Sequence, residues 1–595
     1  MIRCTSTFDA VVIDTDKLAN FVPKIYEPSP IEAIKVIFVS YALRLDNRAE
    51  LITELGLSEG ATDSELLAHG WLAWREELAN RLRGAFGFGI FDAATGVLYI
   101  ARDIFGISPI FWAKDEARLI IAASSRGVRS LLSFAPVHNK ASLADFICGG
   151  EIDREQTFFE CVSRFPAANC LVLTKDGEKR TKYWSTGEVP RNKPEISPVQ
   201  KFRDLFQNSV RNCFSSGNSV LFLSGGLDSS SIAGALHAEG VKVPSLSLVY
   251  PETKDWSDKA YLSALENDLG ITLDGTPSDF HDPLADISKW LRVVDGPYLP
   301  YGHSVSSQLL LKARALGHKV VLSGHGGDEI VSYGFGRLNE LARQGQWLTL
   351  WRETSAAAGL YHESRFRLFR RYLSHIEWFR RIERRLRLQV KGKVWSGQQF
   401  LADSIAKTLD PSRFRRKFAG ERLDHDERMI HEEALNSPLQ PISLEVIATC
   451  SHAEGVETRM PFYDRDLVEL SLSLPSEWKL NGGLSRFILR KAMENSLPQS
   501  VVRRQDKFDF TDNFKRGLLA KKEALLALTD PEIHRLDEWV NIDAVKAVRA
   551  RLQEPINSIE TVDAFFVWRV AVLASWLQIA SESLAKPQLH LIQEE

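Results

Sequence analysis

The sequence predicts an α/β protein whose C-terminal part is built around a doubly wound parallel sheet. Short apolar runs typical of buried strands alternate there with longer segments in which apolar residues recur at helical spacing. We expect strands at 220–223, 246–250 and 319–323 and helices at 199–213, 257–269 and 304–316. Such alternation favours parallel strands connected by helices, with ligands bound beyond the carboxyl ends of the strands.

Length and composition limit the classes of protein to which the chain can belong. Its 595 residues predict about two to four domains, and a net charge of −3 gives no general attraction to nucleic acid. The six cysteines form no Cys-x-x-Cys pair, which argues against a zinc site or a disulfide framework and for a reducing compartment, the cytoplasm. The N-terminus lacks the apolar core of a signal peptide, and the apolar stretch 564–580 contains Arg569. We therefore expect a core helix there and no membrane partner.

The most informative stretch is a turn rich in small residues, Ser224-Gly225-Gly226-Leu227-Asp228-Ser229-Ser230. It follows the first expected strand and leads into a helical pattern at 231–238. Backbone N–H groups at a helix start, together with the serine hydroxyl groups, suit phosphate oxygens, and Asp228 can hold Mg²⁺ between phosphates. The turn has no lysine at the position that a Walker loop requires, so γ-phosphate transfer is not expected. The alternative is a packing turn without a ligand.

This turn resembles the pyrophosphate loop of the N-type ATP pyrophosphatases (adenine nucleotide α-hydrolase-like fold), in the subgroup of the asparagine synthetases. The resemblance implies an ATP-dependent, AMP-forming carbon–nitrogen ligase, in which ATP is cleaved between its α and β phosphates and an amine attacks the acyl-adenylate. It also implies that adenine packs where Leu223 and Leu248 stand, although lone leucines are equally typical of a core. The implied nucleotide-binding residues are Leu223, Ser224, Gly225, Gly226, Leu227, Asp228, Ser229, Ser230, Leu248, Ser323 and Gly324.

The third expected strand leads into Ser323-Gly324-His325-Gly326-Gly327-Asp328-Glu329, which is similar to the family's Ser-Gly-x-Gly-x-Asp-Glu segment. The resemblance implies that the backbone of this loop lines adenine and ribose, and that Asp328 is the second Mg²⁺ carboxylate, opposite Asp228. Two carboxylates together with phosphate oxygens and water suit the octahedral preference of Mg²⁺. His325 could be catalytic, but we expect it to line the loop.

Further segments match the family's motifs and supply the expected catalytic residues. Residues 456–464 resemble Leu-Glu-x-Arg-x-Pro-Phe-Leu-Asp, which implies that Glu457 orients the attacking amine and accepts its proton. An ion pair between Glu457 and Arg459 is the structural alternative. The closing motifs of the family match at 484–492 and 503–510. The second of these implies that Lys507 stabilises charge on the α-phosphate, the alternative being a solvated basic cluster.

The first part of the chain resembles the N-terminal glutaminase domain of asparagine synthetases over most of residues 34–185. The segments that carry the resemblance are 44–51, 83–92 and 101–110. The resemblance implies an Ntn-type αββα fold. Residues 185–200 contain three prolines and read as a linker, so we place the domains at 1–190 and 200–595.

This glutaminase-like domain is expected to be inactive. The family's nucleophile is a cysteine at residue 2 whose own amine serves as the base. Here residue 2 is Ile, and Cys4 lies inside the chain, where its nitrogen is an amide that cannot accept a proton. Residues 40–43 stand in place of the Asn-Gly oxyanion segment, so the oxyanion donors are missing as well.

The synthetase part therefore requires an amine from solution or from the substrate itself. The Thr-x-His-His-Glu segment of asparagine synthetases is replaced by residues 269–275, which argues against free aspartate as substrate. The stretches 321–334 and 341–347 look most like lasso peptide cyclases. That resemblance implies adenylation of an Asp or Glu side chain of a core peptide, followed by attack of the peptide's N-terminal amine to form a macrolactam, with release of AMP and pyrophosphate. The implied partners are the ribosomally made precursor, a separate leader-binding protein and a leader peptidase.

Three alternatives stay open. The first is an ammonia-using, asparagine synthetase-like ligase acting on a small acid. The second is a β-lactam synthetase-like ring closure, although those enzymes have Tyr where Glu457 stands. The third is a non-catalytic ATP-binding scaffold. Separately, a basic amphipathic segment at 365–393 is either a docking site for a peptide or partner protein or a helix with a solvated basic face.

Overall fold

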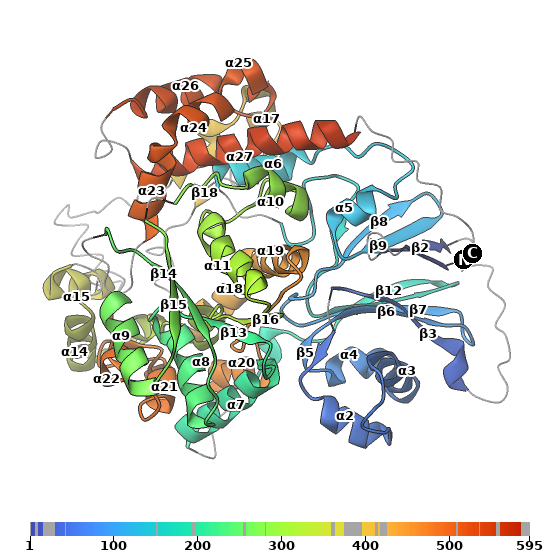
Figure 1. Ribbon diagram of the computed structural model, residues 1–595, viewed down its shortest axis with the longest axis horizontal. Helices are drawn as coiled ribbons and strands as arrows, with labels where there is room; N and C mark the ends of the chain where they lie inside the picture. The colour runs from blue at the N-terminus through green and yellow to red at the C-terminus, as the bar shows by residue number, and fades with distance from the viewer. Residues whose placement is uncertain are drawn as a thin grey trace.

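The computed structural model has two parts that lie side by side, an N-terminal part built on antiparallel sheets and a C-terminal part built on a parallel sheet (Figure 1). Its description covers the chain apart from residues 1, 6–9, 16–29, 42, 150–152, 192–196, 254–257, 280, 359–362, 374–394, 411–414, 417–424, 507–509, 535, 555–559 and 585–595. Helices cover the sheets of both parts, so the α/β class expected from the sequence is confirmed.

The N-terminal part contains two stacked five-stranded sheets. The first has the order β1 (Ile2–Thr5), β2 (Ala10–Asp14), β9 (Arg118–Ala122), β8 (Phe111–Asp115) and β10 (Ser163–Arg164). The second has the order β12 (Gly177–Lys182), β11 (Asn169–Thr174), β7 (Val97–Arg102), β6 (Gly87–Asp92) and β3 (Ile34–Val39). Apolar side chains such as Val11 and Ile100 pack between the sheets, while α3 (Asp63–Trp74) and α6 (Lys140–Cys148) contribute to the clusters on their outer faces. This is the predicted αββα layering.

The first strand carries the position at which the resemblance places the glutaminase nucleophile. Ile2 opens β1, and the backbone of Cys4 pairs with Val11 in the antiparallel ladder of β1 and β2. Ser40, which lies where the oxyanion donors are expected, is buried, and its hydroxyl donates to the carbonyl of Pro109. The nitrogen of Cys4 is thus a peptide amide within a strand, as the sequence predicted.

The C-terminal part is organised by a five-stranded, fully parallel sheet. Its order is β15 (Leu273–Pro277), β14 (Ser245–Val249), β13 (Ser219–Phe222), β16 (Val320–Leu322) and β19 (Glu457–Arg459). The helices that pack on it include α7 (Pro198–Cys213), α8 (Leu227–Ala238), α9 (Asp258–Leu269), α10 (Ile287–Val294), α11 (His303–Ala315) and α19 (Leu439–Ala453). The strand order changes direction between β13 and β16, which places the expected ligand crevice at their carboxyl ends.

Successive residues of the central strands enter two different cores. Val220 and Val321 join the cluster formed with α10, α11 and α19, whereas Leu221 and Leu322 join the cluster formed with α7, α8 and α9. Because successive side chains of a strand point to opposite faces, both faces of this sheet are covered by helices. The resulting doubly wound arrangement holds the loops after β13 and β16 on a rigid base.

The last described helix, α27 (Thr561–Leu584), closes the apolar core that the two parts share. It is long and apolar enough to cross a membrane by length and composition alone, but 72% of its apolar window is buried inside the protein. Trp576 packs against Phe158 and Phe159 of the N-terminal part, with ring centroids 5.9 and 5.7 Å away. Arg569 donates from Nε to the carbonyl of Ile147 in α6, at 3.0 Å. The helix is therefore a core helix, as its central arginine predicted.

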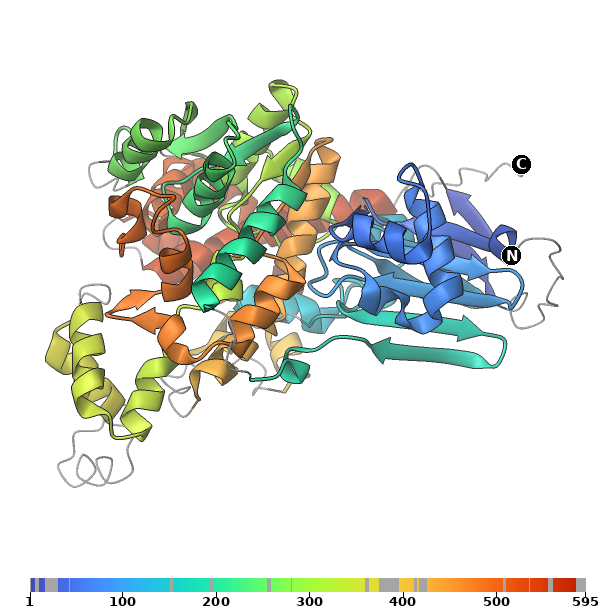
Figure 2. The same ribbon diagram turned by 90° about the horizontal axis from the view of Figure 1, so that it is seen from below.

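Buried ion pairs also connect the two parts, which lie against each other along one side (Figure 2). Arg129, the last residue of α5 (Ser125–Arg129), makes two hydrogen bonds to the carboxylate of Asp295 at the end of α10. Arg164 reaches both carboxylate oxygens of Glu445 in α19, at 3.0 and 3.1 Å. All four side chains are at most 9% exposed, so each charge depends on its partner for compensation.

The basic segment at 365–393 is described only at its start. Helix α15 (Arg365–Leu373) packs on α14 (Trp347–Ala357) at the end of the molecule remote from the N-terminal part (Figure 2). Its buried contacts come from Leu368 and Tyr372, whereas Arg365 and Phe366 are exposed. Residues 374–394 lie outside the described residues, so the choice between docking helix and solvated face stays a prediction.

Candidate functional site

A cavity of about 1000 Å³ lies beyond the carboxyl ends of β13, β14 and β16. Nine of the eleven residues expected to bind nucleotide line it, namely Leu223, Ser224, Gly226, Leu227, Asp228, Ser229, Leu248, Ser323 and Gly324. The other two lie just behind the wall: Gly225 accepts a hydrogen bond at its carbonyl from Arg504, and the Ser230 side chain is fully buried. The location is the crevice that the strand order predicts for a doubly wound sheet.

The loops after β13 and β16 touch each other through glycines. A Cβ atom on Gly324 would lie 2.6 Å from the backbone nitrogen of Ser229, and one on Gly327 would lie 2.4 Å from the Asp228 carboxylate carbon. Both distances are shorter than any real Cβ contact, and the atoms concerned include backbone, so a side chain at either position would force the loops apart. These glycines therefore allow the two acid-bearing loops to meet.

The wall formed by α8 presents a helix N-terminus to the cavity. Gly226 is the N-cap residue, and no side chain caps the first N–H groups of this twelve-residue helix. The neighbouring hydroxyl groups of Ser224 and Ser229 lie 3.2 Å apart, and the Ser224 N–H donates to the Ser229 oxygen at 3.2 Å. Uncapped N–H groups, serine hydroxyl groups and the positive end of the helix dipole form a suitable site for an anion such as phosphate.

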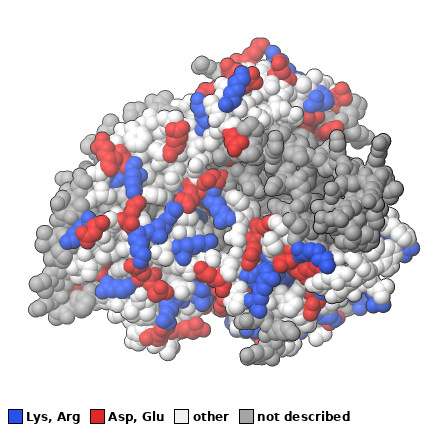
Figure 3. Space-filling model, turned by 180° about the vertical axis from the view of Figure 1, so that it is seen from behind, with Lys and Arg blue, Asp and Glu red and all other residues white. Residues whose placement is uncertain are grey.

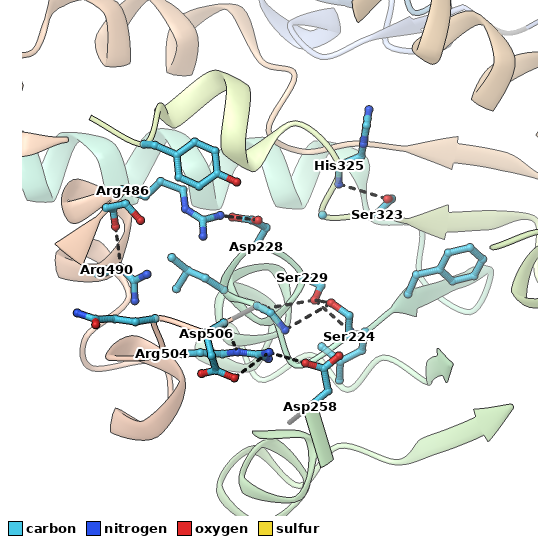
Figure 4. A pocket seen from close by; sticks show the side chains of 18 of the residues that line it. Ser224, Asp228, Ser229, Asp258, Ser323, His325, Arg486, Arg490, Arg504 and Asp506 are labelled. Atoms are coloured by element: carbon cyan, nitrogen blue, oxygen red, sulfur yellow. Dashed lines mark hydrogen bonds and ion pairs between the residues drawn. The ribbon is translucent and has the colours of Figure 1, made fainter. Parts of the chain in front are cut away.

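Asp228 and Asp328 meet at a single cationic atom. The Nη1 nitrogen of Arg486 lies 2.6 Å from both carboxylate oxygens of Asp228 and 2.6 Å from an oxygen of Asp328. Figure 4 shows the Arg486 side chain reaching Asp228 across the cavity. Burial acts to lower the pKa of Arg486, but the two carboxylates outweigh it and raise that pKa above its usual value. The structure thus brings together the two acids that the sequence assigned to Mg²⁺.

Several cationic residues of the cavity were not predicted from the sequence. Arg504 is buried, donates to the Gly225 carbonyl at 3.0 Å and pairs with Asp258 at 2.5 Å, while its guanidinium covers the Tyr261 ring at 4.2 Å. Arg490 lines the cavity beside it (Figure 4). The segments that contain Arg490 and Arg504 resemble family motifs, and this resemblance is the sequence signal for both residues.

The remaining predicted residues are placed less favourably or not described. Glu457 opens β19 and forms an ion pair with Arg459 at 2.7 Å; it is not among the residues that line the cavity. Burial acts to lower the pKa of Arg44 in the N-terminal part, but Cys213 and Asp46 raise it above its usual value, and Glu457 adds a smaller contribution. Lys507 lies outside the described residues, so the roles of both residues stay predictions. His325 lines the cavity, and its backbone N–H donates to the Ser323 hydroxyl at 3.3 Å.

The last residue of the Glu457 motif, Asp464, makes stability depend on pH. Its carboxylate caps α20 (Arg465–Ser473) by accepting from the N–H of Leu467 at 2.9 Å, and burial raises its pKa to about 7. An unfolded Asp has a pKa of about 3.9, so between about pH 4 and 7 the folded chain binds more protons than the unfolded chain. The contribution of Asp464 to stability therefore decreases as pH rises through this window.

We expect the Asp464→Asn variant to gain stability relative to the parent at pH 8 but not at pH 5, because asparagine keeps a capping oxygen and carries no charge. Urea unfolding of both proteins at the two pH values measures the difference. The Asp464→Ala variant, which loses the cap, should be less stable than Asp464→Asn at both pH values. An equal difference between parent and Asp464→Asn at pH 5 and pH 8 would contradict the raised pKa.

Comparisons with known proteins give two family matches that together span most of the chain. A model of the asparagine synthase family matches residues 201–578, and a model of the glutamine amidotransferase domain matches residues 44–184. Asparagine synthetase [glutamine-hydrolyzing] 3 of Bacillus subtilis is 24% identical over 531 residues, which are 84% of this chain and 79% of that protein. A putative asparagine synthetase of Mycobacterium tuberculosis is 25% identical over 497 residues, 77% of this chain and 72% of its own length.

Proposed function

Since the chain belongs to the asparagine synthase family and is an ATP-dependent, AMP-forming carbon–nitrogen ligase, we propose that it closes a macrolactam ring in a ribosomally made peptide, as lasso peptide cyclases do. The observation that carries the ligase part is the convergence of Asp228 and Asp328 on one cationic atom beside the uncapped start of α8. The peptide part is supported by Ile at residue 2 and by the strand position of Cys4, because the backbone nitrogen of Cys4 is an amide and would not serve as the base for ammonia release.

The residues of the cavity fit ATP with Mg²⁺. A volume of about 1000 Å³ is within the range of ligand pockets, and the uncapped α8 N-terminus suits the phosphates. Asp228 and Asp328 supply hard oxygen ligands; within the described residues no cluster of three His, Cys, Asp or Glu side chains offers an alternative metal site. When bound, Mg²⁺ would neutralise phosphate charge and so favour departure of pyrophosphate. Arg486 occupies the meeting point of the two acids and would share or yield it.

Separate residues of the chain would bind the nucleotide, stabilise the α-phosphate charge and accept the proton of the amine. Leu223 and Leu248 face the cavity where a purine can pack, and the loop at Ser323 and Gly324 offers backbone groups to the ribose. Lys507 would stabilise negative charge on the α-phosphate, both when the acyl-adenylate forms and when AMP leaves. Glu457 would orient the attacking amine and take its proton, which requires exchange of its present partner, Arg459.

An intramolecular amine gives this reaction a physical advantage over ammonia from solution. When amine and activated carboxyl belong to one bound peptide, effective molarities can reach about 10⁵ M or more. Water must be kept from the cavity, since hydrolysis of the activated acid competes with ring closure. We propose as partners the precursor peptide, a separate leader-binding protein and a leader peptidase, in the cytoplasm. Basic and acidic side chains are interspersed over the face shown in Figure 3. Because nucleic acid binding requires a concentration of basic side chains, we propose no nucleic acid partner.

The proposal predicts that the protein catalyses the loss of one water from its substrate core peptide. With ATP and MgCl₂, mass spectrometry should show loss of one water, together with release of AMP and pyrophosphate. When the N-terminus of the same peptide is acetylated, pyrophosphate should still be released from ATP. The acyl-adenylate should then only hydrolyse, which returns the uncyclised peptide. Pyrophosphate release with aspartate and ammonia in the absence of any peptide would favour the small-acid ligase instead.

A further inference from the structure

The helix that carries Asp328 rests on a buried histidine. Helix α12 (Gly327–Val331) has only five residues and is too short to be stable alone. Nε2 of His431 lies 2.9 Å from the carbonyl oxygen of Glu329 and 3.1 Å from that of Ile330, near the end of α12. His431 belongs to α18 (Glu427–Leu435) and is fully buried. It therefore supports α12 from inside the protein, at the two residues that directly follow Asp328.

The partners of His431 determine where its proton lies. Carbonyl oxygens only accept, so Nε2 must carry the proton that is donated to α12. Nδ1 lies 2.8 Å from Nζ of Lys479 and accepts from that ammonium group. Burial and the Lys479 charge lower the pKa of His431 well below its usual value, which keeps the imidazole neutral. Lys479 fixes the tautomer in this way.

A buried carboxylate completes the cluster. Glu427 lies 3.7 Å from Nζ of Lys479; its oxygens accept from the Ser332 hydroxyl at 2.7 Å and from the Gly336 N–H at 2.9 Å. Ser332 ends α12 with φ of 67°, a left-handed conformation that a serine adopts only when its surroundings hold it. The cluster thus fixes both the end of α12 and the turn that follows it.

The same cluster holds the segment that carries Arg486. The carbonyl of Lys479 accepts from the N–H of Phe487 at 2.9 Å. Between these two residues lies the hairpin of β20 (Leu480–Asn481) and β21 (Leu484–Ser485), which leads directly to Arg486. Lys479 therefore contacts α12 through His431 and the Arg486 segment through its own backbone. His431 and Lys479 thus connect α12, which carries Asp328, with the segment that carries Arg486.

We propose that His431 and Lys479 are positioning residues of the ligase, which set the distance between Asp328 and the Arg486 segment and so prepare the site for Mg²⁺ with ATP. This inference rests on the proposed use of ATP, not on the identity of the acid or amine. Neither side chain lines the cavity, so neither is expected to touch the nucleotide. Partners of metal-binding side chains typically contribute about 10- to 100-fold to metal affinity or activity.

The test compares two replacements of His431 that both carry a side-chain amide but differ in length. Glutamine in His431→Gln places an amide N–H near the position of Nε2, whereas asparagine in His431→Asn is too short to reach the α12 carbonyls. We expect His431→Asn to raise the Mg²⁺ concentration required for half-maximal binding of α,β-methylene-ATP about 10-fold or more, measured by calorimetry, and His431→Gln to remain near the parent. The matched control is His303→Asn, since His303 is also buried but packs on Trp290, away from α12.

The possible outcomes separate this inference from the proposed function. If the parent binds the analogue with Mg²⁺ and both His431 variants bind it equally well, the positioning role is wrong and the ATP site stands. If the parent shows no binding of the analogue at any Mg²⁺ concentration, the proposed function fails and the positioning role with it. A loss shared by His303→Asn, or by His431→Gln to the same extent as His431→Asn, would indicate general destabilisation and overturn the positioning role.

Discussion

We expect the Asp228→Asn variant to lose pyrophosphate release by about 10³-fold or more, the largest effect of any single change considered. Asp228 provides two of the three carboxylate oxygens that meet at Nη1 of Arg486, and asparagine removes their charge while keeping the shape of the side chain. A bound divalent ion contributes several kcal/mol to stabilisation of phosphoryl charge, and each 1.36 kcal/mol corresponds to about tenfold in rate. A coupled pyrophosphate assay with the core peptide measures the loss.

The control for this change is Asp115→Asn, which removes a buried carboxylate that accepts from the Ser133 hydroxyl in the N-terminal part. The rate of pyrophosphate release should decrease only as far as the variant's loss of folded protein explains. Thermal unfolding of both variants shows whether the fold is retained. A non-catalytic scaffold would lose no product in either variant, so an unchanged product yield with Asp228→Asn would contradict the ligase assignment.

The largest effect on stability is expected from Arg129→Met. This change leaves the carboxylate of Asp295 buried between the two parts of the molecule without the two hydrogen bonds that it now accepts from Arg129. Removal of one partner from a buried ion pair typically costs about 3–5 kcal/mol, since the remaining charge stays desolvated. We therefore expect a clear decrease in the urea midpoint of unfolding.

Two further variants test whether the lost charge compensation is the cause. The double variant Arg129→Met with Asp295→Asn removes both charges, and asparagine tolerates the left-handed φ of 53° at this position. It should be less destabilised than Arg129→Met alone. Lys114→Met breaks the exposed pair with Glu178 and should change stability by about 1 kcal/mol or less. Equal losses from Lys114→Met and Arg129→Met would contradict the argument.

The sequence predicted those parts of the fold whose local pattern matches their structure. The strand at 220–223 is observed as β13 (Ser219–Phe222), because a short apolar run before glycines is typical of a buried parallel strand. In the parallel sheet two strands were missed: β15 contains Gly275 and Pro277 and lacks an apolar run, and β19 has only three residues. The helix expected from 231 begins at Leu227, since the small polar residues of the turn already form its first helical turn.

The residues of the site that lie in recognisable sequence motifs were predicted, and the contacts that Arg486 and His431 make with distant segments were not. Asp228 and Asp328 come from two recognisable segments, and their meeting follows from parallel strands that end at one edge of a sheet. The match of 484–492 to a family motif marked the segment of Arg486, but not its place between the two acids, because Arg486 lies 258 residues from Asp228 in the chain and no local pattern links the two. The histidine behind α12 was equally hidden, since a buried His431 in an amphipathic helix is indistinguishable in sequence from an ordinary core residue.

The contact of Trp576 with Phe158 has a consequence for the order in which the protein can be completed on the ribosome. The aromatic surface around Phe158 is synthesised long before α27, the helix that covers it. At synthesis rates of about 5–20 residues per second, this surface stays uncovered for roughly 20–80 seconds before α27 is made. We therefore expect the nascent N-terminal part to be prone to aggregation until α27 packs on it, and a chain truncated before residue 561 to stay so.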